Sequence, residues 1–375
     1  RCAVIFRKAT YMNAILLVNS IFFLFTVLGA VDYLLGNRFG IGSQFERGIC
    51  CTGKLIIAMT GFMSLAPILG RFLTPLVSPF FTALTADPSA FAAMLLANDS
   101  GGASLAAQMA LDPAAGAFNG YIVASMLGGA VMCSIPMTML SVHEENMPAA
   151  VYGLIIGIFS VPFGCVIGGL TAGYRMSLML HNLIPAVMLS TLLFLALLFF
   201  KQRVVRPFQM FGNFLVTVSL TGLLLTMARE LLGMTPFPDL TPFSEVISVI
   251  GNIALVLSGV FPLMAVLMRL LKHPIAAIAQ KLQLKEYDLS GLLTTSVNLF
   301  PLFDMLNDMT PRGVLLNTAF VVGANCMFGD HFAFTLQMRP DLVFSVMLAK
   351  GAAGLLSLIV ALALAPVLLK NQQHR

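Results

Sequence analysis

Runs of about 20 consecutive apolar residues, the length that spans the hydrocarbon core of a bilayer, recur along nearly the whole chain. Only 10% of the 375 residues are charged, whereas about 25% are charged in an ordinary soluble protein. These two features exclude a soluble enzyme, a nucleic-acid-binding module and a disordered chain. We therefore predict an all-α polytopic integral membrane protein whose surroundings are the lipid bilayer.

The apolar pattern predicts about 9–11 transmembrane segments, because each long run is sufficient for one crossing. Nine runs are long, and they cover about 12–35, 53–73, 117–141, 149–173, 178–200, 208–232, 246–271, 314–336 and 342–369. Two shorter stretches, about 89–110 and 287–306, are interrupted by polar residues. We interpret these two stretches as broken or re-entrant helices.

The two interrupted stretches occupy matching places in an internal repeat. With a shift of 198 residues, Ile49–Leu95 aligns without a gap to Ile247–Leu293, with nine identities in 47 positions. Gly53 then aligns with Gly251, Gly61 with Gly259 and Arg71 with Arg269. Leucine bias does not produce matched glycines and arginines, so we predict two structurally related halves.

This repeat divides the chain into four parts: a non-native or flexible N-terminal extension, a first transmembrane repeat, a linking helix with a basic turn, and a second transmembrane repeat. Their bounds are 1–11, 12–173, 174–207 and 208–375. The net charge of +5 lies in short connecting segments and concerns topology rather than a polyanionic partner.

The orientation of the repeats depends on the interrupted stretches. If both are re-entrant, each repeat crosses the membrane four times, and the linking helix inverts the second copy. The basic segments at 201–206 and 269–285 and the tail at 370–375 would then all face the cytoplasm. If the stretches cross fully, the repeats are parallel. We favour the inverted arrangement.

Two polar clusters lie inside the interrupted stretches. The first contains Asn98, Asp99 and Ser100, followed by two glycines, and the second runs from Thr294 to Pro301 and contains Ser296 and Asn298. Paired interruptions in corresponding halves are typical of a transporter binding site, where unwound backbone lines a cavity. The alternative is a pair of polar helix contacts that stabilise the bundle.

A third polar feature is Asn325-Cys-Met-Phe-Gly329-Asp330-His331, late in an apolar segment. Adjacent helical residues point about 100° apart, so the side chains of Asp330 and His331 are not expected to form a local pair. His331 has no second histidine or cysteine at ligand spacing, and we predict no metal site. Asp330 is either a second carboxylate for a cation or proton, or a residue that caps the next turn.

Other features carry no expected chemistry. The charge of Asp32 stands at a segment end, where we expect it to be solvated. No phosphate-binding loop, nucleophile elbow or H-E-x-x-H motif is present, so the sequence predicts no cofactor and no enzyme.

Several motifs together resemble the bacterial ethanolamine-utilisation permease family (EutH). They are Ala30-Val-Asp32, Gln44-Phe45-Glu46, Leu95-Leu-Ala-Asn98-Asp99-Ser-Gly-Gly, Ser134-Ile-Pro136, Val161-Pro162-Phe-Gly-Cys165-Val-Ile-Gly-Gly169, Val-Asn298-Leu-Phe-Pro301, Met309-Thr-Pro-Arg312-Gly313 and Phe328-Gly329-Asp330-His331-Phe332. The resemblance extends from about Met12 to the C-terminal helix. It implies a multi-pass permease of the bacterial inner membrane that imports ethanolamine for catabolism.

The chain departs from the family pattern at a few positions. Ser100 stands where a bulkier apolar residue is expected, Asp304 where a small residue is expected, and the loops near 36–44 and 234–245 are short. The substrate could therefore be another small amine or amino alcohol.

We hypothesise a carrier for protonated ethanolamine with Asp99 as the principal counter-charge, because an unsolvated ammonium requires a carboxylate or a ring of carbonyls. Asn98, Ser100, Ser296 and Asn298 would complete the shell, and Asp330 would be a second anion or a coupling proton site. A channel for an amine or ammonium, and a membrane-embedded enzyme using Asp99, Asp330 and His331, are the alternatives.

Overall fold

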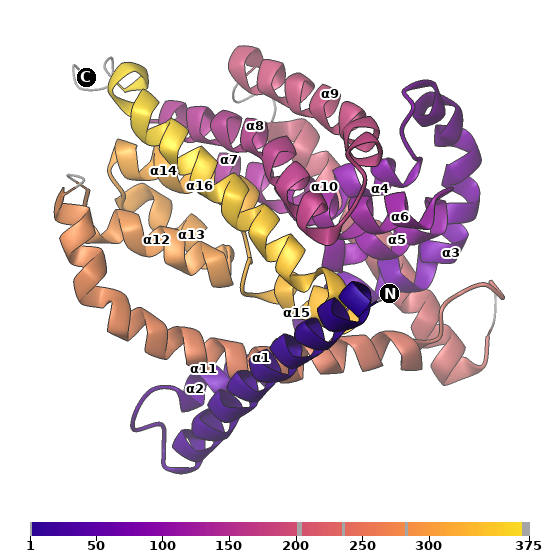
Figure 1. The fold of residues 1–375 in the computed structure, drawn as a ribbon, viewed down its shortest axis with the longest axis horizontal. Coiled ribbons are helices and arrows are strands. Elements are labelled where there is room, and N and C mark those ends of the chain that lie inside the picture. Colours follow the sequence, from indigo (N-terminus) through magenta and orange to yellow (C-terminus); the bar gives the residue numbers. More distant parts are fainter. Residues whose placement is uncertain (1, 201–204, 235–236, 282–283, 370–375) are drawn as a thin grey trace.

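The described part of the chain consists of helices and their connections, without strands. The structure is a computed structural model that describes residues 2–200, 205–234, 237–281 and 284–369 (Figure 1). Eight helical segments among these residues are long and apolar enough to cross a membrane. They are Ile15–Leu34, Gly42–Ala83, Pro113–Ser141, Met147–Ala172, Met176–Phe200, Arg206–Leu232, Phe243–Leu271 and Pro340–Leu368.

The helices of the first half begin with α1 and end with α8. Their bounds are α1 Cys2–Leu34, α2 Gly42–Cys50, α3 Thr52–Ala83, α4 Ser89–Leu95, α5 Ala103–Met109, α6 Pro113–Ala117, α7 Ile135–Ser141 and α8 Met147–Ala172. A short turn with π-helical hydrogen bonds, Asn98–Gly102, precedes α5, and wide π-helical turns over Phe118–Gly128 and Ala130–Ser134 join α6 to α7.

The linking helix is α9, and the second half follows it with a similar order of elements. The bounds are α9 Met176–Phe200, α10 Val205–Leu232, α11 Phe243–Lys281, α12 Glu286–Val297, α13 Phe300–Met305, α14 Pro311–Ala324, α15 Asp330–Met338 and α16 Val343–Leu368. Two 3₁₀ turns, Leu306–Asp308 and Pro340–Leu342, connect the last of these helices.

Eight of the nine long apolar segments therefore form long helices, as predicted. The exception is the segment 314–336, which is interrupted between Ala324 and Asp330 and forms α14 and α15. The physical reason lies in tertiary contacts. Cys326 donates its backbone N–H to the Thr295 carbonyl at 2.9 Å, and Phe328 donates to the Ser296 carbonyl at 2.7 Å. These bonds replace the hydrogen bonds of a continuous helix.

Both interrupted stretches fold back so that their ends meet, each closed by a buried aspartate. Asp87, which precedes α4, accepts hydrogen bonds from the backbone N–H groups of Leu111 and Asp112, both at 2.9 Å. Asp288, in the first turn of α12, accepts from the backbone N–H of Thr310 at 3.0 Å and from its hydroxyl at 2.8 Å. Each stretch is thus a helical hairpin whose two ends, called its base, are held together by hydrogen bonds to an aspartate.

Positions beyond the region that the sequence alignment covers also correspond under the predicted repeat. The same 198-residue shift relates Asp112-Pro113, where α6 begins, to Thr310-Pro311, where α14 begins. Asp112 and Thr310 are both N-caps whose side chains accept a backbone N–H of the following turn. The two halves therefore use the same device to begin the helix that follows each hairpin.

The two halves exchange their outer helices. Helix α1 packs on α11 of the second half, while α10 packs on α3 of the first half; Figure 1 shows α1 lying across α11. The repeated arginines make corresponding contacts. Arg71 pairs with Asp239 at 2.8 Å in the loop before α11, and Arg269 donates to the Phe39 carbonyl in the loop before α2.

Asp32 is buried, which corrects the expectation that it is solvated. Its carboxylate is 2% exposed and accepts backbone N–H groups from Phe39, Ile41 and Gly42 at 2.8 to 2.9 Å. The chain turns back sharply after α1, and the freed N–H groups of that turn require an acceptor. Asp32 supplies this acceptor and orders the loop before α2.

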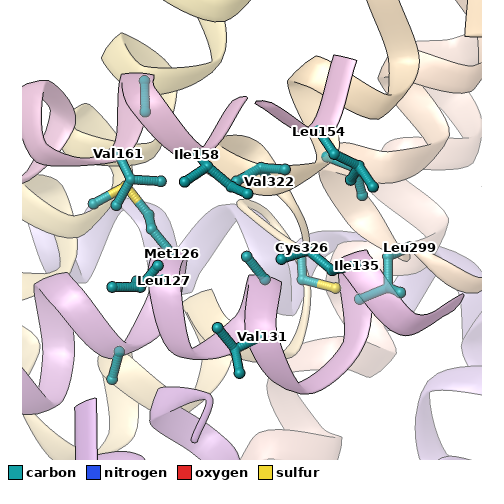
Figure 2. Close-up of a cluster of buried hydrophobic side chains, with 14 of the residues drawn as sticks. Met126, Leu127, Val131, Ile135, Leu154, Ile158, Val161, Leu299, Val322 and Cys326 are labelled. Atoms are coloured by element: carbon teal, nitrogen blue, oxygen red, sulfur yellow. The ribbon is translucent and has the colours of Figure 1, made fainter. Parts of the chain in front are cut away.

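The centre of the molecule is an apolar cluster formed by the wide helix between α6 and α7 together with α8, α14 and the segment after α14 (Figure 2). Met126 and Leu127 on the wide helix, Leu154 and Ile158 on α8, and Val322 on α14 are all fully buried or nearly so. This cluster fixes the helices that hold the polar groups described below.

Some predictions concern residues or properties outside these observations. Residues 201–204 of the basic turn at 201–206 and the tail at 370–375 lie outside the described residues, as do residues 282–283 of the basic stretch 269–285. The four-part division of the chain, including a non-native or flexible segment 1–11, and the inverted orientation of the halves stay predictions.

Candidate functional site

The first hairpin is unwound at its tip, and this is where Asp99 lies. After α4 the backbone is extended at Leu96 and Ala97, Ser100 has non-helical torsion angles, and Gly101 has φ +99°. A Cβ atom on Gly101 would lie 2.4 Å from the Cβ atom of Phe62 on α3. Glycine therefore permits both the left-handed turn and the close approach to α3.

The second unwound segment is the interruption between α14 and α15. Cys326 has φ +46°, and Gly329 has φ −103° and ψ −135°, so α15 begins afresh at Asp330. A Cβ atom on Gly329 would lie 2.0 Å from the Val297 carbonyl oxygen at the tip of the second hairpin. The tip of this hairpin therefore shapes the segment that carries Asp330.

The two unwound segments bring Asp99, Asp330 and His331 together. One ligand atom from each residue lies within 4.8 Å of the others. His331 Nε2 is 3.6 Å from Asp99 Oδ1, and the backbone N–H of His331 donates to Asp330 Oδ1 at 3.0 Å. Asp330 is therefore the first residue of α15 and also belongs to the cluster. Its role as a second carboxylate for a cation or proton stays a prediction.

Asp330 and His331 converge on the same neighbour although they are adjacent in sequence. Both belong to the first turn of α15, whose N-terminal end meets the tip of the first hairpin. Successive side chains of a helix point about 100° apart, but at the end of a helix both can still contact one external group. Here that group is the Asp99 carboxylate. From the sequence only a pair within the helix was considered, and His331 was therefore named for the enzyme alternative but not among the substrate-binding residues.

Asn98 and Ser100 lie beside the cluster, and their contact with a substrate stays a prediction. Asn98 is fully buried, and its side-chain N–H donates to Thr335 Oγ1 on α15 at 3.2 Å. Ser100 donates its hydroxyl to Asp99 Oδ1 at 3.1 Å. These two residues connect the hairpin tip to α15 and orient the Asp99 carboxylate.

Ser296 and Asn298 use their side chains locally. Ser296 donates its hydroxyl to the Leu292 carbonyl of its own helix at 3.0 Å, and Asn298 Oδ1 accepts the backbone N–H of Phe300 at 3.0 Å. Among the described residues, neither side chain forms a hydrogen bond to the Asp99 cluster. The backbone carbonyl of Ser296 accepts the N–H of Phe328 and so helps to place the unwound segment before Asp330. Their contact with a substrate stays a prediction.

Lys350 is a polar residue of this region that was not predicted from the sequence. Lys350, on α16, is 0% exposed and donates from Nζ to the Ser125 carbonyl at 2.6 Å and to Asn325 Oδ1 at 2.8 Å. Asn325 Nδ2 in turn donates to Ser134 Oγ at 3.1 Å. A lysine within the apolar run 342–369 is the signal that could have found it, because such residues are rare in membrane segments.

The cluster has the chemistry of a cation site. Asp99 and Asp330 supply carboxylate oxygens, His331 supplies an imidazole nitrogen, and Asn98 Oδ1 and His331 Nδ1 are buried without a hydrogen-bond partner in the described structure. An organic ammonium would be stabilised by the carboxylates and could satisfy the unpaired acceptors. The donor set also suits a metal ion, so the absence of a metal site stays a prediction.

Comparisons with known proteins identify relatives along nearly the whole chain. Residues 12–364 match the family described as "Ethanolamine utilisation protein, EutH". The chain is 38% identical to the probable ethanolamine permease EutH of Listeria monocytogenes serotype 1/2a (strain 10403S), over 94% of each chain. It is 32% identical to the probable ethanolamine permease EutH of Escherichia coli (strain K12), over 95% of this chain and 96% of the relative. No solved structure matches the chain.

Proposed function

The chain belongs to the EutH family of ethanolamine utilisation proteins, and from this premise we propose that it carries ethanolamine across the membrane as the protonated amine, bound between Asp99 and Asp330. It is a multi-pass protein of the bacterial inner membrane, and its function is ethanolamine transport. The protonated form of the substrate, the site residues and the absence of an enzymatic reaction are the parts that we propose.

The observation that carries this proposal is a pair of carboxylates, buried Asp99 and half-buried Asp330, that two unwound segments bring together. Asp99 is 4% exposed, and it meets Asp330 although 231 positions separate them in sequence. Two carboxylates in a desolvated site repel each other unless a cation lies near both. Unwound helices that converge from two halves are also the usual setting of a transporter site.

Ethanolamine matches the unpaired polar atoms of the cluster. Its ammonium offers three N–H donors, and its hydroxyl offers one donor. Asp99 and Asp330 would accept from the ammonium, while Asn98 Oδ1 or His331 Nδ1 would accept from the hydroxyl. The substrate would therefore satisfy acceptors that are otherwise buried without partners, which is the arrangement that favours an amino alcohol over a simple ammonium ion.

The membrane potential is sufficient to drive accumulation. A monovalent cation gains about 2.3 kcal/mol per 100 mV, which corresponds to a roughly fifty-fold accumulation ratio. Transport of the protonated amine therefore requires no sodium or proton partner, and we propose uniport.

The test is uptake of radiolabelled ethanolamine into proteoliposomes that contain the purified protein, under an inside-negative potential and without a proton or sodium gradient. We expect saturable uptake, and we expect Asp99→Asn and Asp330→Asn each to reduce it by about tenfold or more because each removes a counter-charge from a desolvated site.

The matched control is Asp308→Asn, which removes an exposed carboxylate outside the cluster and should leave uptake unchanged. Each variant must elute as a single species from a sizing column. Normal uptake by Asp99→Asn would remove this residue from the site, and uptake of ammonium in place of ethanolamine would change the substrate.

A further inference from the structure

Lys350 is a fully buried cation whose charge has no partner in direct contact. It ranks among the largest side chains that are completely buried. Its two hydrogen bonds go to a backbone carbonyl and to the Asn325 amide, both uncharged. Within the described residues, no carboxylate oxygen lies within ion-pair distance of its Nζ atom. Burial of an uncompensated ammonium is very unfavourable, so a charged Lys350 requires anions nearby that do not touch its Nζ atom.

The carboxylates of the candidate site are connected to Lys350 through Asn325 and His331, because His331 Nε2 lies 3.6 Å from Asp99 Oδ1. Asn325, which accepts from Lys350, lies in the same unwound segment that leads to Asp330. A Cβ atom on Gly129 would lie 3.1 Å from Asn325 Nδ2 and 3.2 Å from His331 Cε1, so these two side chains face the same turn. Lys350 therefore belongs to the electrostatic surroundings of the cluster.

We propose that Lys350 is a resident cation that sets the charge of the site, so that the site accepts one monovalent ammonium and excludes divalent metal ions. The ammonium part of this inference rests on the proposed function. The metal part concerns only the cluster of Asp99, Asp330 and His331.

The charges of the four side chains determine which cation the site accepts. With His331 as a neutral imidazole, Asp99 and Asp330 contribute two negative charges and Lys350 one positive charge. The remaining single negative charge is neutralised by one ammonium ion. A divalent ion would leave an excess positive charge in a desolvated region, which is unfavourable.

Lys350 explains how this donor set can serve an organic cation. Two carboxylates and one imidazole at mutual distances within 4.8 Å form a set that metal ions such as Mn²⁺ accept. Without the positive charge of Lys350 nearby, the two carboxylates would leave the site with two negative charges and would favour a divalent ion. The hydrogen bonds to Ser125 and Asn325 hold the ammonium of Lys350 outside the cluster, so it contributes charge without occupying the substrate position.

The test compares Mn²⁺ binding, measured by electron paramagnetic resonance, between the full-length wild type and Lys350→Gln. Glutamine retains two N–H donors for the Ser125 carbonyl and Asn325 but carries no charge. We expect Lys350→Gln to bind Mn²⁺ with a dissociation constant at least about tenfold lower than the wild type. We expect Lys350→Arg to restore weak binding and Lys350→Gln/Asp330→Asn to lose the gained affinity.

Two further measurements place the Mn²⁺ ion. Ethanolamine should displace it from Lys350→Gln, because both would occupy the same carboxylates. Lys54→Gln, which removes an exposed lysine of α3, is the matched control and should bind Mn²⁺ as weakly as the wild type. Lys350→Met replaces Lys350→Gln if the latter does not fold.

Equal Mn²⁺ affinity of wild type and Lys350→Gln would overturn the proposal, as would tight Mn²⁺ binding by Lys350→Arg, which keeps the charge. Mn²⁺ that ethanolamine does not displace would also overturn it. These results are distinct from a failure of the proposed function, which would be an absence of ethanolamine uptake by the wild type, because the Mn²⁺ affinities are compared without ethanolamine.

Discussion

Gly101 illustrates how a single residue determines the geometry of the site. It follows Asp99 and Ser100, it has φ +99°, and its missing side chain allows the hairpin tip to approach Phe62. Any side chain at this position would strain the backbone and displace α3 or the tip. The position of the Asp99 carboxylate therefore depends on a neighbouring residue that has no side chain.

We expect Gly101→Ala to lower the free energy of unfolding by about 1–3 kcal/mol and to reduce ethanolamine uptake more than this loss of stability explains. Thermal unfolding in detergent and proteoliposome uptake are the two measurements. Gly212→Ala on α10 is the control, since a Cβ atom there meets nothing within 4 Å. Uptake by Gly101→Ala at the wild-type rate would show that the turn is not needed to place Asp99.

At the scale of the element, the hairpins depend on their pinned bases. Asp87 and Asp288 are both buried, and each accepts hydrogen bonds from backbone at the opposite end of its hairpin. Hydrogen bonds to a charged acceptor contribute more to stability than those between neutral groups. Each carboxylate therefore keeps the two ends of an interrupted helix together and holds its unwound tip in position.

Replacement of Asp288 by alanine removes the acceptor of the Thr310 backbone N–H and hydroxyl, and we expect a loss of about 2 kcal/mol in local stability. Hydrogen exchange of the amides near Gly313 should accelerate by roughly thirty-fold, which is the same energy expressed as a rate. Asp308→Ala, an exposed carboxylate of the same hairpin, should leave this exchange unchanged. Slow exchange in Asp288→Ala would mean that other contacts close the hairpin.

At the scale of the whole molecule, helices of the two halves cross at two corresponding glycines, Gly61 and Gly259. A Cβ atom on Gly61 of α3 would lie 1.8 Å from the Ser219 carbonyl oxygen of α10. A Cβ atom on its repeat partner, Gly259 of α11, would lie 2.2 Å from the Phe22 carbonyl oxygen of α1. Small residues permit close backbone approach where helices cross in a membrane. The exchange of α1 and α10 between the halves therefore depends on these two positions.

Leucine at Gly61 or Gly259 should separate a crossing pair and lower the unfolding free energy by about 1–3 kcal/mol or more. The controls are Gly53→Leu and Gly251→Leu, a repeat pair on the same two helices where a Cβ atom meets nothing within 4 Å. We expect the first pair alone to lower the unfolding temperature in detergent. An equal effect of all four substitutions would show that helix propensity rather than the crossings determines the result.

The sequence alone was sufficient to predict the class of fold and most of its long helices. A membrane-spanning helix must satisfy its backbone internally over about 20 apolar residues, so its signal is local. The polar residues at 98–100 and the matched glycines were readable for the same reason, because charges, amides and small residues are rare in apolar runs unless they have a role. These signals predicted Asp99, Asn98, Ser100 and the paired interruptions.

The tertiary structure decided what these signals could not specify. The interruption before Asp330 arises because carbonyl groups of the second hairpin accept the N–H groups of Cys326 and Phe328, and no local residue pattern encodes those partners. Likewise, His331 and Lys350 acquire their roles through contacts with residues far away in the chain. Composition reflects the solvent that each segment meets, whereas the charge and shape of the site depend on which distant segments pack together.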